Sequence, residues 1–456
     1  MKYDLIILGG GPAGYTGAIK AAKEGLSVLL IERERLGGVC LNKGCIPTKT
    51  LLKCADIYYS SVNSEKFGVN FSEVSYDINA FFVRKNDIVN KLVDGVSKLV
   101  AAAGVTVIFG DARLTGSQTV AVGSDVFQAN HIMLATGGSA VLPPIKGIQY
   151  ALNSDDVLNG IVNGEKVVIV GGGVIGVEFA TFFKKIGKQV TIIELADRIL
   201  PLLDRDISLN LTMCLKKLGI EIFVGAGVSE ICDKSVKFSV REREQEIPYD
   251  SIIVCTGRRA NTLGLGLENT KVKFDKTGVF TNEFRHTDDE FIYAVGDLVS
   301  GNIQLAHNAS ADAEVVVHNI LNGDTKVKPK FVPSCIYTSP EAAIVGLNEA
   351  EAVAQGIEVE FGKFPMAANG KAVLDGEDKG FIKVLFNKTT QKLLGVSLLS
   401  ERATDIIGAI TTLVELGVSR DEILNSIYPH PTIVEAFYEA TLDSVGKAVH
   451  ILSRKK

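Results

Sequence analysis

One sequence pattern occurs twice in this 456-residue chain and constrains its fold more than any other feature. Each copy has an apolar run, a Gly-x-Gly-x-x-Gly motif and a segment with helical periodicity; the copies begin at Asp4 and Val167. A second apolar run follows each helix and ends in a glutamate, Glu32 or Glu194, 18 residues beyond the third glycine. Apolar runs of this kind are typical of buried parallel strands, so the pattern predicts two strand–helix–strand units.

These residues suit the binding of a dinucleotide. Glycines permit a tight turn and let a pyrophosphate approach the helix N-terminus, whose free N–H groups and dipole favour anions. The carboxylate after the second strand can accept hydrogen bonds from ribose hydroxyls. One motif alone could be turn glycines and a surface glutamate, but two copies with matched spacing indicate two dinucleotide sites. The glycines are Gly9, Gly11, Gly14, Gly171, Gly173 and Gly176.

Later apolar runs end at residues that can also face a cofactor. Two of them run into Thr-Gly, at Thr136-Gly137 and at Thr256-Gly257. A third is followed by Asp297, whose carboxylate could hydrogen-bond a cofactor's ribityl or phosphate region. Glycine has no Cβ atom to obstruct a ligand at such a strand end.

The order of these segments predicts three domains. We expect one dinucleotide-binding domain of residues 1–149 and 263–334, with a second, residues 150–262, inserted into it. Residues 335–456 have no glycine-rich site and combine short strands with long helical patterns, so we expect an α+β domain that serves association. The predicted fold class is therefore α/β, with two Rossmann-like three-layer domains around mostly parallel sheets and a C-terminal α+β domain.

Cys40 and Cys45 interrupt the first dinucleotide unit. Cα atoms five residues apart in an ideal helix are roughly 8.6 Å apart, whereas a disulfide needs about 5.5–6 Å. Gly44 and Pro47 loosen the chain, so a distorted turn can close the pair, and such a bond suits redox cycling. Two zinc ligands would need partners that the sequence does not supply, and we predict no metal site.

Composition limits the possible partners and compartment. The chain has 46% hydrophobic and 22% charged residues and a net charge of −5, without a long basic run, which argues against nucleic acid and anionic membranes. The first apolar run is too short for a signal peptide, and no run approaches the ~20 residues that span a bilayer. Seven cysteines, an odd number, indicate a reducing compartment, so we expect a cytoplasmic protein and no structural disulfide.

A histidine near the C-terminus has two interpretations. His430 lies between Pro429 and Pro431, and Pro431 is expected to begin the next helix. Glu435 could orient the imidazole while the other ring nitrogen handles a thiol proton. Alternatively His430 is a surface residue, and Glu435 belongs to a Thr432-x-x-Glu435 capping box. The pattern alone does not decide between these two.

Over essentially its full length the chain resembles the pyridine nucleotide–disulfide oxidoreductases. The matching motifs are Gly-Gly-x-Cys-x-x-x-x-Gly-Cys-Ile-Pro-x-Lys, both glycine motifs, 294–297 with 305–307, and 430–435. The resemblance implies FAD bound by Gly9, Gly11, Gly14, Glu32, Lys49, Ala112, Thr136, Gly137, Asp297 and Ala306. It implies NAD bound by Gly171, Gly173, Gly176, Glu194, Val228 and Gly257.

The resemblance also implies a mechanism. Cys40 would meet the substrate, Cys45 would lie beside the flavin, and Lys49 and Glu178 would form an ion pair near the flavin's reactive nitrogen. His430, oriented by Glu435, would be the acid–base supplied by the other subunit of a homodimer. The implied reaction oxidises protein-bound dihydrolipoamide through the disulfide and FAD and reduces NAD⁺. The partner would be a lipoylated protein of a 2-oxo acid dehydrogenase or glycine cleavage complex.

The chain departs from the family pattern at three positions and leaves rival functions to compare. Tyr428 replaces a usual His, Gly138 a common Ser and Ala260 a usual Pro.

Glutathione reductases use NADPH and carry arginines where this chain has Leu195 and Pro201, and mercuric reductases need a C-terminal cysteine pair that is missing here. A non-catalytic flavoprotein scaffold is a third alternative, against which the intact cysteines and histidine argue.

Overall fold

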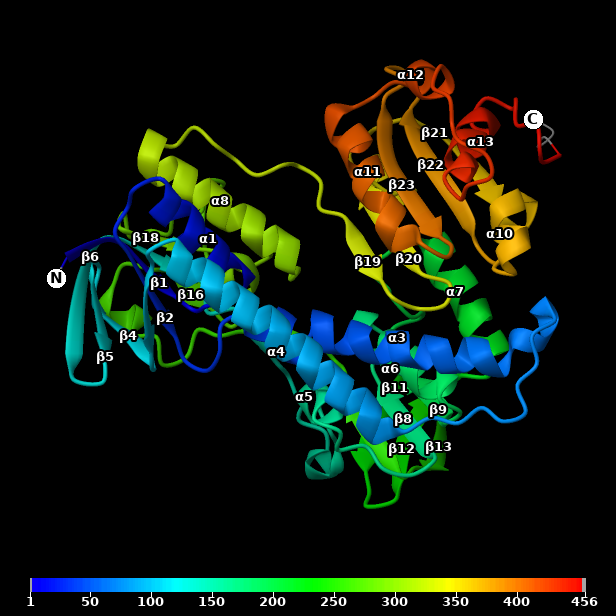
Figure 1. Cartoon of the computed structure of the whole chain (residues 1–456), viewed down its shortest axis with the longest axis horizontal. Coiled ribbons are helices and arrows are strands. Elements are labelled where there is room, and N and C mark those ends of the chain that lie inside the picture. The colour runs from blue at the N-terminus through cyan, green and yellow to red at the C-terminus, as the bar shows by residue number, and fades with distance from the viewer. Residues whose placement is uncertain (1, 453–456) are drawn as a thin grey trace.

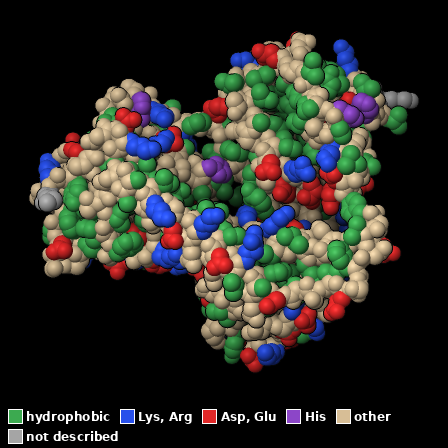
Figure 2. Space-filling model, in the orientation of Figure 1, with side chains coloured by type: hydrophobic (Ala, Val, Ile, Leu, Met, Phe, Trp, Pro, Cys, Tyr) green, Lys and Arg blue, Asp and Glu red, His purple; other side chains and the backbone are tan. Residues whose placement is uncertain are grey.

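The chain, described over residues 2–452 by a computed structural model, forms three sheet-centred bodies. Two long helices link the first two bodies, and an extended segment after residue 322 leads into the third (Figure 1). Helices α3 (Cys45–Val62) and α4 (Ile78–Ala102) run from the N-terminal body across the second body. On the face drawn in Figure 2 the three bodies enclose a hollow, with charged side chains along its rim. No helix within the described range is long and apolar enough to cross a membrane.

The first body is built on a seven-stranded sheet in the order β3-β2-β1-β6-β5-β4, with β18 also paired to β6. Its central strands are parallel, and they are the apolar runs of the sequence. Leu5 on β1 lies opposite Val28 on one side and opposite His131 on the other. Helices α1 (Pro12–Lys23) and α8 (Ala306–Asn322) lie side by side in this body. The strands are β1 (Lys2–Leu8), β2 (Val28–Glu32), β3 (Thr106–Phe109), β4 (Ala112–Gly116), β5 (Thr119–Val122), β6 (Asp125–Leu134) and β18 (Ile292–Ala294).

The second body repeats this plan with a four-stranded parallel sheet, β10-β9-β8-β14. The chain enters and leaves it through two strands that pair with each other, β7 (Gly138–Ala140) and β15 (Arg258–Ala260). The predicted domain boundaries at 149/150 and 262/263 each come shortly after one of these two strands in the sequence, and they stay a prediction. Its other elements are α5 (Ser154–Leu158), β8 (Lys166–Val170), α6 (Val174–Lys185), β9 (Gln189–Ile193), α7 (Arg205–Leu218), β10 (Glu221–Phe223), β11 (Ala226–Ile231), β12 (Ser235–Val240), β13 (Arg243–Pro248) and β14 (Ser251–Val254).

The third body has an antiparallel sheet in the order β19-β20-β23-β22-β21, with helices packed on it. The predicted α/β fold with a C-terminal α+β domain is thus confirmed. Its elements are β19 (Ser334–Ile336), β20 (Ala342–Gly346), α9 (Glu349–Ala354), β21 (Val359–Pro365), α10 (Gly370–Asp375), β22 (Phe381–Asn387), β23 (Leu393–Leu399), α11 (Ala403–Leu416), α12 (Arg420–Leu424) and α13 (Glu435–Asp443).

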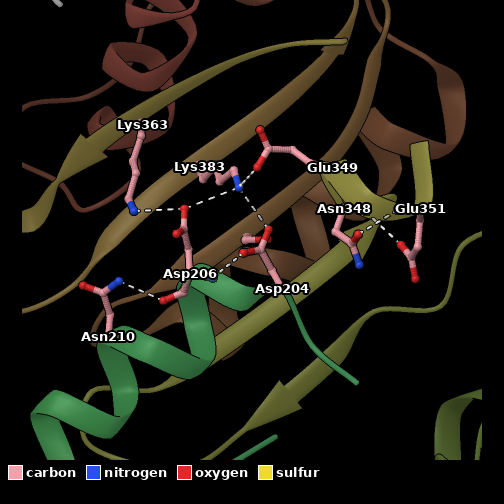
Figure 3. A network of polar contacts seen from close by, with 9 residues as sticks. Asp204, Asp206, Asn210, Asn348, Glu349, Glu351, Lys363 and Lys383 are labelled. Atoms are coloured by element: carbon pink, nitrogen blue, oxygen red, sulfur yellow. Dashed lines mark hydrogen bonds and ion pairs between the residues drawn. The ribbon is translucent and has the colours of Figure 1, made fainter. Parts of the chain in front are cut away.

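A set of ion pairs, here named the Lys383 network, attaches the second body to the third (Figure 3). Lys383 on β22 is only 5% exposed, and its ammonium lies 2.6 Å from Glu349, 3.3 Å from Asp204 and 3.4 Å from Asp206. Lys363 on β21 adds a contact of 3.0 Å to Asp206. Since Asp204 caps α7 and Asp206 lies in its first turn, the network fixes that helix against the sheet.

The helix after His430 begins later than expected. Pro431 was predicted to be its first residue, but α13 begins at Glu435, and residues 431–434 form a turn. The prediction was wrong because Glu435 itself binds the turn: its Oε2 accepts a hydrogen bond of 2.7 Å from the Thr432 N–H. The peptide bond between His430 and Pro431 is cis.

Candidate active site

The two cysteines of the motif lie on either side of a break between two helices. Cys40 belongs to α2 (Gly38–Lys43) and Cys45 is the first residue of α3. Gly44 separates them with φ −153° and ψ −109°, a conformation outside the helical region. The break replaces the regular helical spacing, which is too wide for a disulfide.

A glycine contact attaches this segment to the first dinucleotide loop. The Gly37 N–H donates to the Gly10 carbonyl at 2.8 Å. Gly37 and Gly38 both have positive φ, and a Cβ atom on Gly38 would stand 2.6 Å from the Gly11 Cα. Only glycine allows the two backbones to come this close, so the position of the cysteine segment is fixed relative to the dinucleotide loop.

Cys40 and Cys45 are both free, half-buried cysteines, and their side chains are hydrogen-bonded to each other. The hydrogen bond from Cys40 lowers the pKa of Cys45 to about 7, with help from the Lys49 ammonium and against the effect of burial. The same hydrogen bond, together with burial, raises the pKa of Cys40. Of the two thiols, Cys45 is therefore the one that ionises more readily.

Lys49 and Glu178 form an ion pair between α3 and α6. The Lys49 Nζ lies 2.9 and 2.7 Å from the two Glu178 carboxylate oxygens. Glu178 is only 3% exposed, and its Oε1 also accepts a hydrogen bond of 3.0 Å from the Tyr337 N–H. The Tyr337 ring covers the Lys49 ammonium, with 4.6 Å between Nζ and the ring centroid. The pair thus joins helices from two bodies to a loop of the third.

The first glycine loop leaves room for a pyrophosphate where the sequence predicts one. Gly9 has φ +103°, and a Cβ atom on Gly14 would stand 1.8 Å from the Gly9 carbonyl oxygen, so both positions require glycine. A Cβ on Gly11 would meet only the Gly38 Cα, at 3.7 Å, and no side chain within residues 2–452 caps the N-terminus of α1 there. Glu32 holds the loop by accepting hydrogen bonds from the Gly10 and Glu34 N–H groups.

The second glycine loop repeats these contacts almost one for one. Gly171 has φ +110°, and a Cβ atom on Gly176 would stand 2.0 Å from the Gly171 carbonyl oxygen. Gly173 faces open space, and no described side chain caps α6. Glu194 accepts hydrogen bonds from the Gly172 and Ala196 N–H groups. Both loops therefore fit a dinucleotide in shape and in unpaired N–H groups.

The other predicted cofactor residues lie on several different elements. Asp297 follows β18, burial raises its pKa, and it lies close enough to Cys40 to affect the pKa of that thiol. A Cβ on Gly138 would stand 2.9 Å from the Arg259 carbonyl oxygen, which explains the absence of a serine there. Ala112 begins β4, Ala306 begins α8, Val228 lies on β11, Thr136 bonds Asn261, and Gly137 and Gly257 have positive φ.

His430 is oriented by Glu435 but stands apart from the cysteines. Its Nδ1 lies 2.9 Å from Glu435 Oε1, so one carboxylate both orients the ring and binds the turn. The His430 side chain is 76% exposed and, among the described residues, contacts neither Cys40 nor Cys45. Tyr428, which stands where the family has a histidine, packs its ring against Phe437 and Tyr438.

Sequence reasoning missed two residues that hold this site together. Tyr337 contacts both members of the Lys49–Glu178 pair. Asp312, fully buried on α8, accepts a hydrogen bond of 3.1 Å from the Gly296 N–H and so fixes the turn that carries Asp297. Neither belongs to a motif. Tyr337 contacts distant parts of the chain, and Asp312 contacts a turn outside its own helix, so only the charge of Asp312 on an apolar helix face was a signal.

Residues 3–313 match the family model described as pyridine nucleotide-disulphide oxidoreductase, and residues 332–441 match the dimerisation domain of the same family. The chain belongs to this family, as its sequence motifs predicted, and is an oxidoreductase. FAD and NAD, the predicted cofactors, are the flavin and the pyridine nucleotide with which the family works.

Among its relatives are proteins named dihydrolipoyl dehydrogenase. That of Bacillus subtilis is 38% identical, over 98% of this chain and 99% of the relative, and that of Mycoplasma genitalium is 38% identical over 95% and 97%. A similar solved structure is the HOCl-induced flavoprotein disulfide reductase RclA from Escherichia coli, with a TM-score of 0.85 and 29% identity over 96% of this chain and 99% of that one.

Proposed function

We propose that this chain oxidises protein-bound dihydrolipoamide and reduces NAD⁺. The observation that carries the proposal is its similarity, over nearly the whole length of both chains, to proteins named dihydrolipoyl dehydrogenase. The thiol pair, the Lys49–Glu178 ion pair and two dinucleotide loops supply the groups that this reaction needs. FAD, when bound, would be held by Gly9, Gly11, Gly14 and Glu32 and would supply the two-electron chemistry that links the reduced cysteines to the nicotinamide.

The pKa difference between the thiols supports their proposed roles. A substrate thiolate attacks the Sγ atom of Cys40 and forms a mixed disulfide, while the Cys40–Cys45 bond breaks and Cys45 leaves as a thiolate. Attack at Cys40 is favoured because a sulfur of lower pKa leaves faster, and Cys45 has a pKa of about 7. The second substrate thiol then displaces Cys40, which takes up a proton, and the lipoyl group departs as a disulfide.

His430 is the proposed proton acceptor for the substrate thiol. Glu435 holds Nδ1, so Nε2 is free to take the proton. Because His430 contacts neither cysteine within its own described chain, we propose that it serves the site of the other subunit. The matched dimerisation domain supports a homodimer built in this way.

The two loops are proposed to bind different cofactors. FAD would lie on Gly9, Gly11, Gly14 and Glu32 and reach Lys49, Ala112, Thr136, Gly137, Asp297 and Ala306. NAD would lie on Gly171, Gly173, Gly176, Glu194, Val228 and Gly257. Glu194 favours NAD because its charge repels the 2′-phosphate of NADP. The nearby Arg198 pairs with Asp197 and donates to the Pro201 carbonyl.

The proposal is tested by assaying the purified protein with two substrate pairs. We expect NADH formation from dihydrolipoamide and NAD⁺, and negligible NADPH oxidation with glutathione disulfide. The reverse preference would show another disulfide reductase, and flavin without turnover would show a scaffold. The donor of the lipoyl group is expected to be a 2-oxo acid dehydrogenase or glycine cleavage complex, and pull-down of a lipoylated protein from the native cell identifies it.

A further inference from the structure

Tyr337 lies where the third body reaches the proposed flavin site. It follows β19, in the loop that leads to β20, and this loop meets α3 and α6 (Figure 1). Its main-chain N–H donates to Glu178 at 3.0 Å, and its ring lies 4.6 Å from the Lys49 ammonium. The Lys49 ammonium therefore contacts both the Glu178 carboxylate and the face of the Tyr337 ring.

The contact lies in a part of the molecule that is largely withdrawn from solvent. Lys49 is 28% exposed and Glu178 is 3% exposed. A cation over an aromatic face gains more when water is excluded. A lysine side chain has four rotatable bonds, so more than one contact is needed to fix its ammonium. Glu178 supplies an ion pair and Tyr337 supplies a ring over the ammonium.

We propose that Tyr337 is a positioning residue, whose ring fixes the Lys49 ammonium and thereby sets the positive charge that Cys45 experiences. The inference rests on the proposed function, because it concerns the thiol that serves the flavin there. The titratable or charged groups that face Cys45 are Cys40, Lys49 and Glu178; among them Lys49 lowers the pKa of Cys45 and Glu178 raises it. Burial raises the pKa of Tyr337 itself to about 12, so its phenol stays neutral near pH 7.

The test follows the long-wavelength absorbance of the Cys45 thiolate beside the flavin in the two-electron-reduced holoenzyme, titrated with pH. Tyr337→Leu removes the ring but keeps the main-chain N–H, and the midpoint should rise by about 0.5–1 pH unit. Tyr337→Phe keeps the ring and should match the wild type. Tyr337→Met fills the space with a flexible thioether and gives the same test if the leucine variant does not fold.

A double-mutant cycle separates this effect from general loosening. In a Lys49→Met background, Tyr337→Leu should cause no further shift of the midpoint, because the charge that the ring positions is absent. An unchanged midpoint in Tyr337→Leu, an equal shift in Tyr337→Phe, or a full shift in the Lys49→Met background would each overturn the inference. Absence of the band from the wild type would instead overturn the proposed function, and the inference with it.

Discussion

Gly38 lies directly against Gly11, and a Cβ atom on Gly38 would stand 2.6 Å from the Gly11 Cα. The first residue of the cysteine-bearing helix α2 thereby touches the residue that caps α1 at the dinucleotide loop. The distance between the thiols and a bound dinucleotide is therefore set by backbone contact, which side-chain rotation cannot change. This relationship is the basis of the first prediction.

Gly38→Ala should weaken both the fold and the retention of flavin. The new methyl group meets backbone and Gly38 has φ +56°, so the loop must move. Gly25→Ala is the matched control, since Gly25 also has positive φ but nothing within 4 Å. We expect the control to lose about 1–2 kcal/mol from its backbone conformation alone, and Gly38→Ala to lose more, together with bound FAD. Equal losses of stability and full flavin content in both variants would disprove the contact's importance.

The two cysteines should give different spectra. Cys45→Ser should lose the long-wavelength thiolate band on two-electron reduction, whereas Cys40→Ser should keep the band and lose lipoamide turnover. In the wild type the band should grow as pH rises through about 7, because Cys45 must lose its proton. Cys40→Ala removes the hydrogen-bond donor that lowers the pKa of Cys45, so its midpoint should lie higher than in Cys40→Ser. Identical spectra for Cys40→Ser and Cys45→Ser would contradict the assigned roles, and a band kept in Cys45→Ser but lost in Cys40→Ser would reverse them.

Glu194 should make the enzyme prefer NAD. A carboxylate at hydrogen-bond distance from the dianionic phosphate of NADP costs a few kcal/mol, which corresponds to at least about 100-fold in kcat/KM. Steady-state kinetics with both nucleotides measure the ratio. Comparable values for NAD⁺ and NADP⁺ would mean that this carboxylate does not face the ribose.

His430 and the cysteines should complement each other between subunits. Cys45→Ser and His430→Gln homodimers should each be inactive. After random subunit exchange, half of the dimers hold one site with both lesions and one with neither, so activity should return to about a quarter of the wild type. If mass spectrometry shows heterodimers and activity stays absent, His430 does not serve the opposite subunit.

The Lys383 network should stabilise the fold. Lys383→Met leaves the buried Asp204 without its cation, and breaking such a pair costs about 3–5 kcal/mol. Lys388→Met, which breaks an exposed pair with Glu358, is the control and should cost less than about 1 kcal/mol. Denaturant titration measures both, and equal small losses would show that the network adds nothing.

The same network should weaken in acid. Burial would raise the pKa of Asp206, but hydrogen bonds and charges from Lys363 and Lys383 hold it below its ordinary value. A carboxyl with a lowered pKa stabilises the fold above its unfolded pKa of about 3.9 and loses that contribution as pH falls through the folded value. The difference in stability between wild type and Lys383→Met should therefore shrink at low pH, which thermal melts across a pH series can follow.

Local sequence patterns predicted most of the fold, because the signals for parallel strands, glycine turns and the helices that follow them lie in short contiguous stretches of sequence. The strands ending at Glu32 and near Glu194 and the glycine loops occur where the periodicity places them. The start of α13 was mispredicted because Glu435 binds the preceding turn through one carboxylate oxygen while the other oxygen contacts His430. Tyr337 could not be found in this way, since it acts through contacts with residues far away in the chain, and Asp312 could not because its partner Gly296 lies outside its own helix.

The double engagement of Glu194 has a consequence for redesign. Its carboxylate bonds the Gly172 and Ala196 N–H groups, and so it braces the loop before any nucleotide arrives. Replacing Glu194 by arginine to bind the 2′-phosphate of NADP would leave both N–H groups without their hydrogen-bond acceptor. A variant that accepts NADP thus needs a second substitution that braces the loop again, and loop flexibility, more than charge, would limit the first attempts at such a switch.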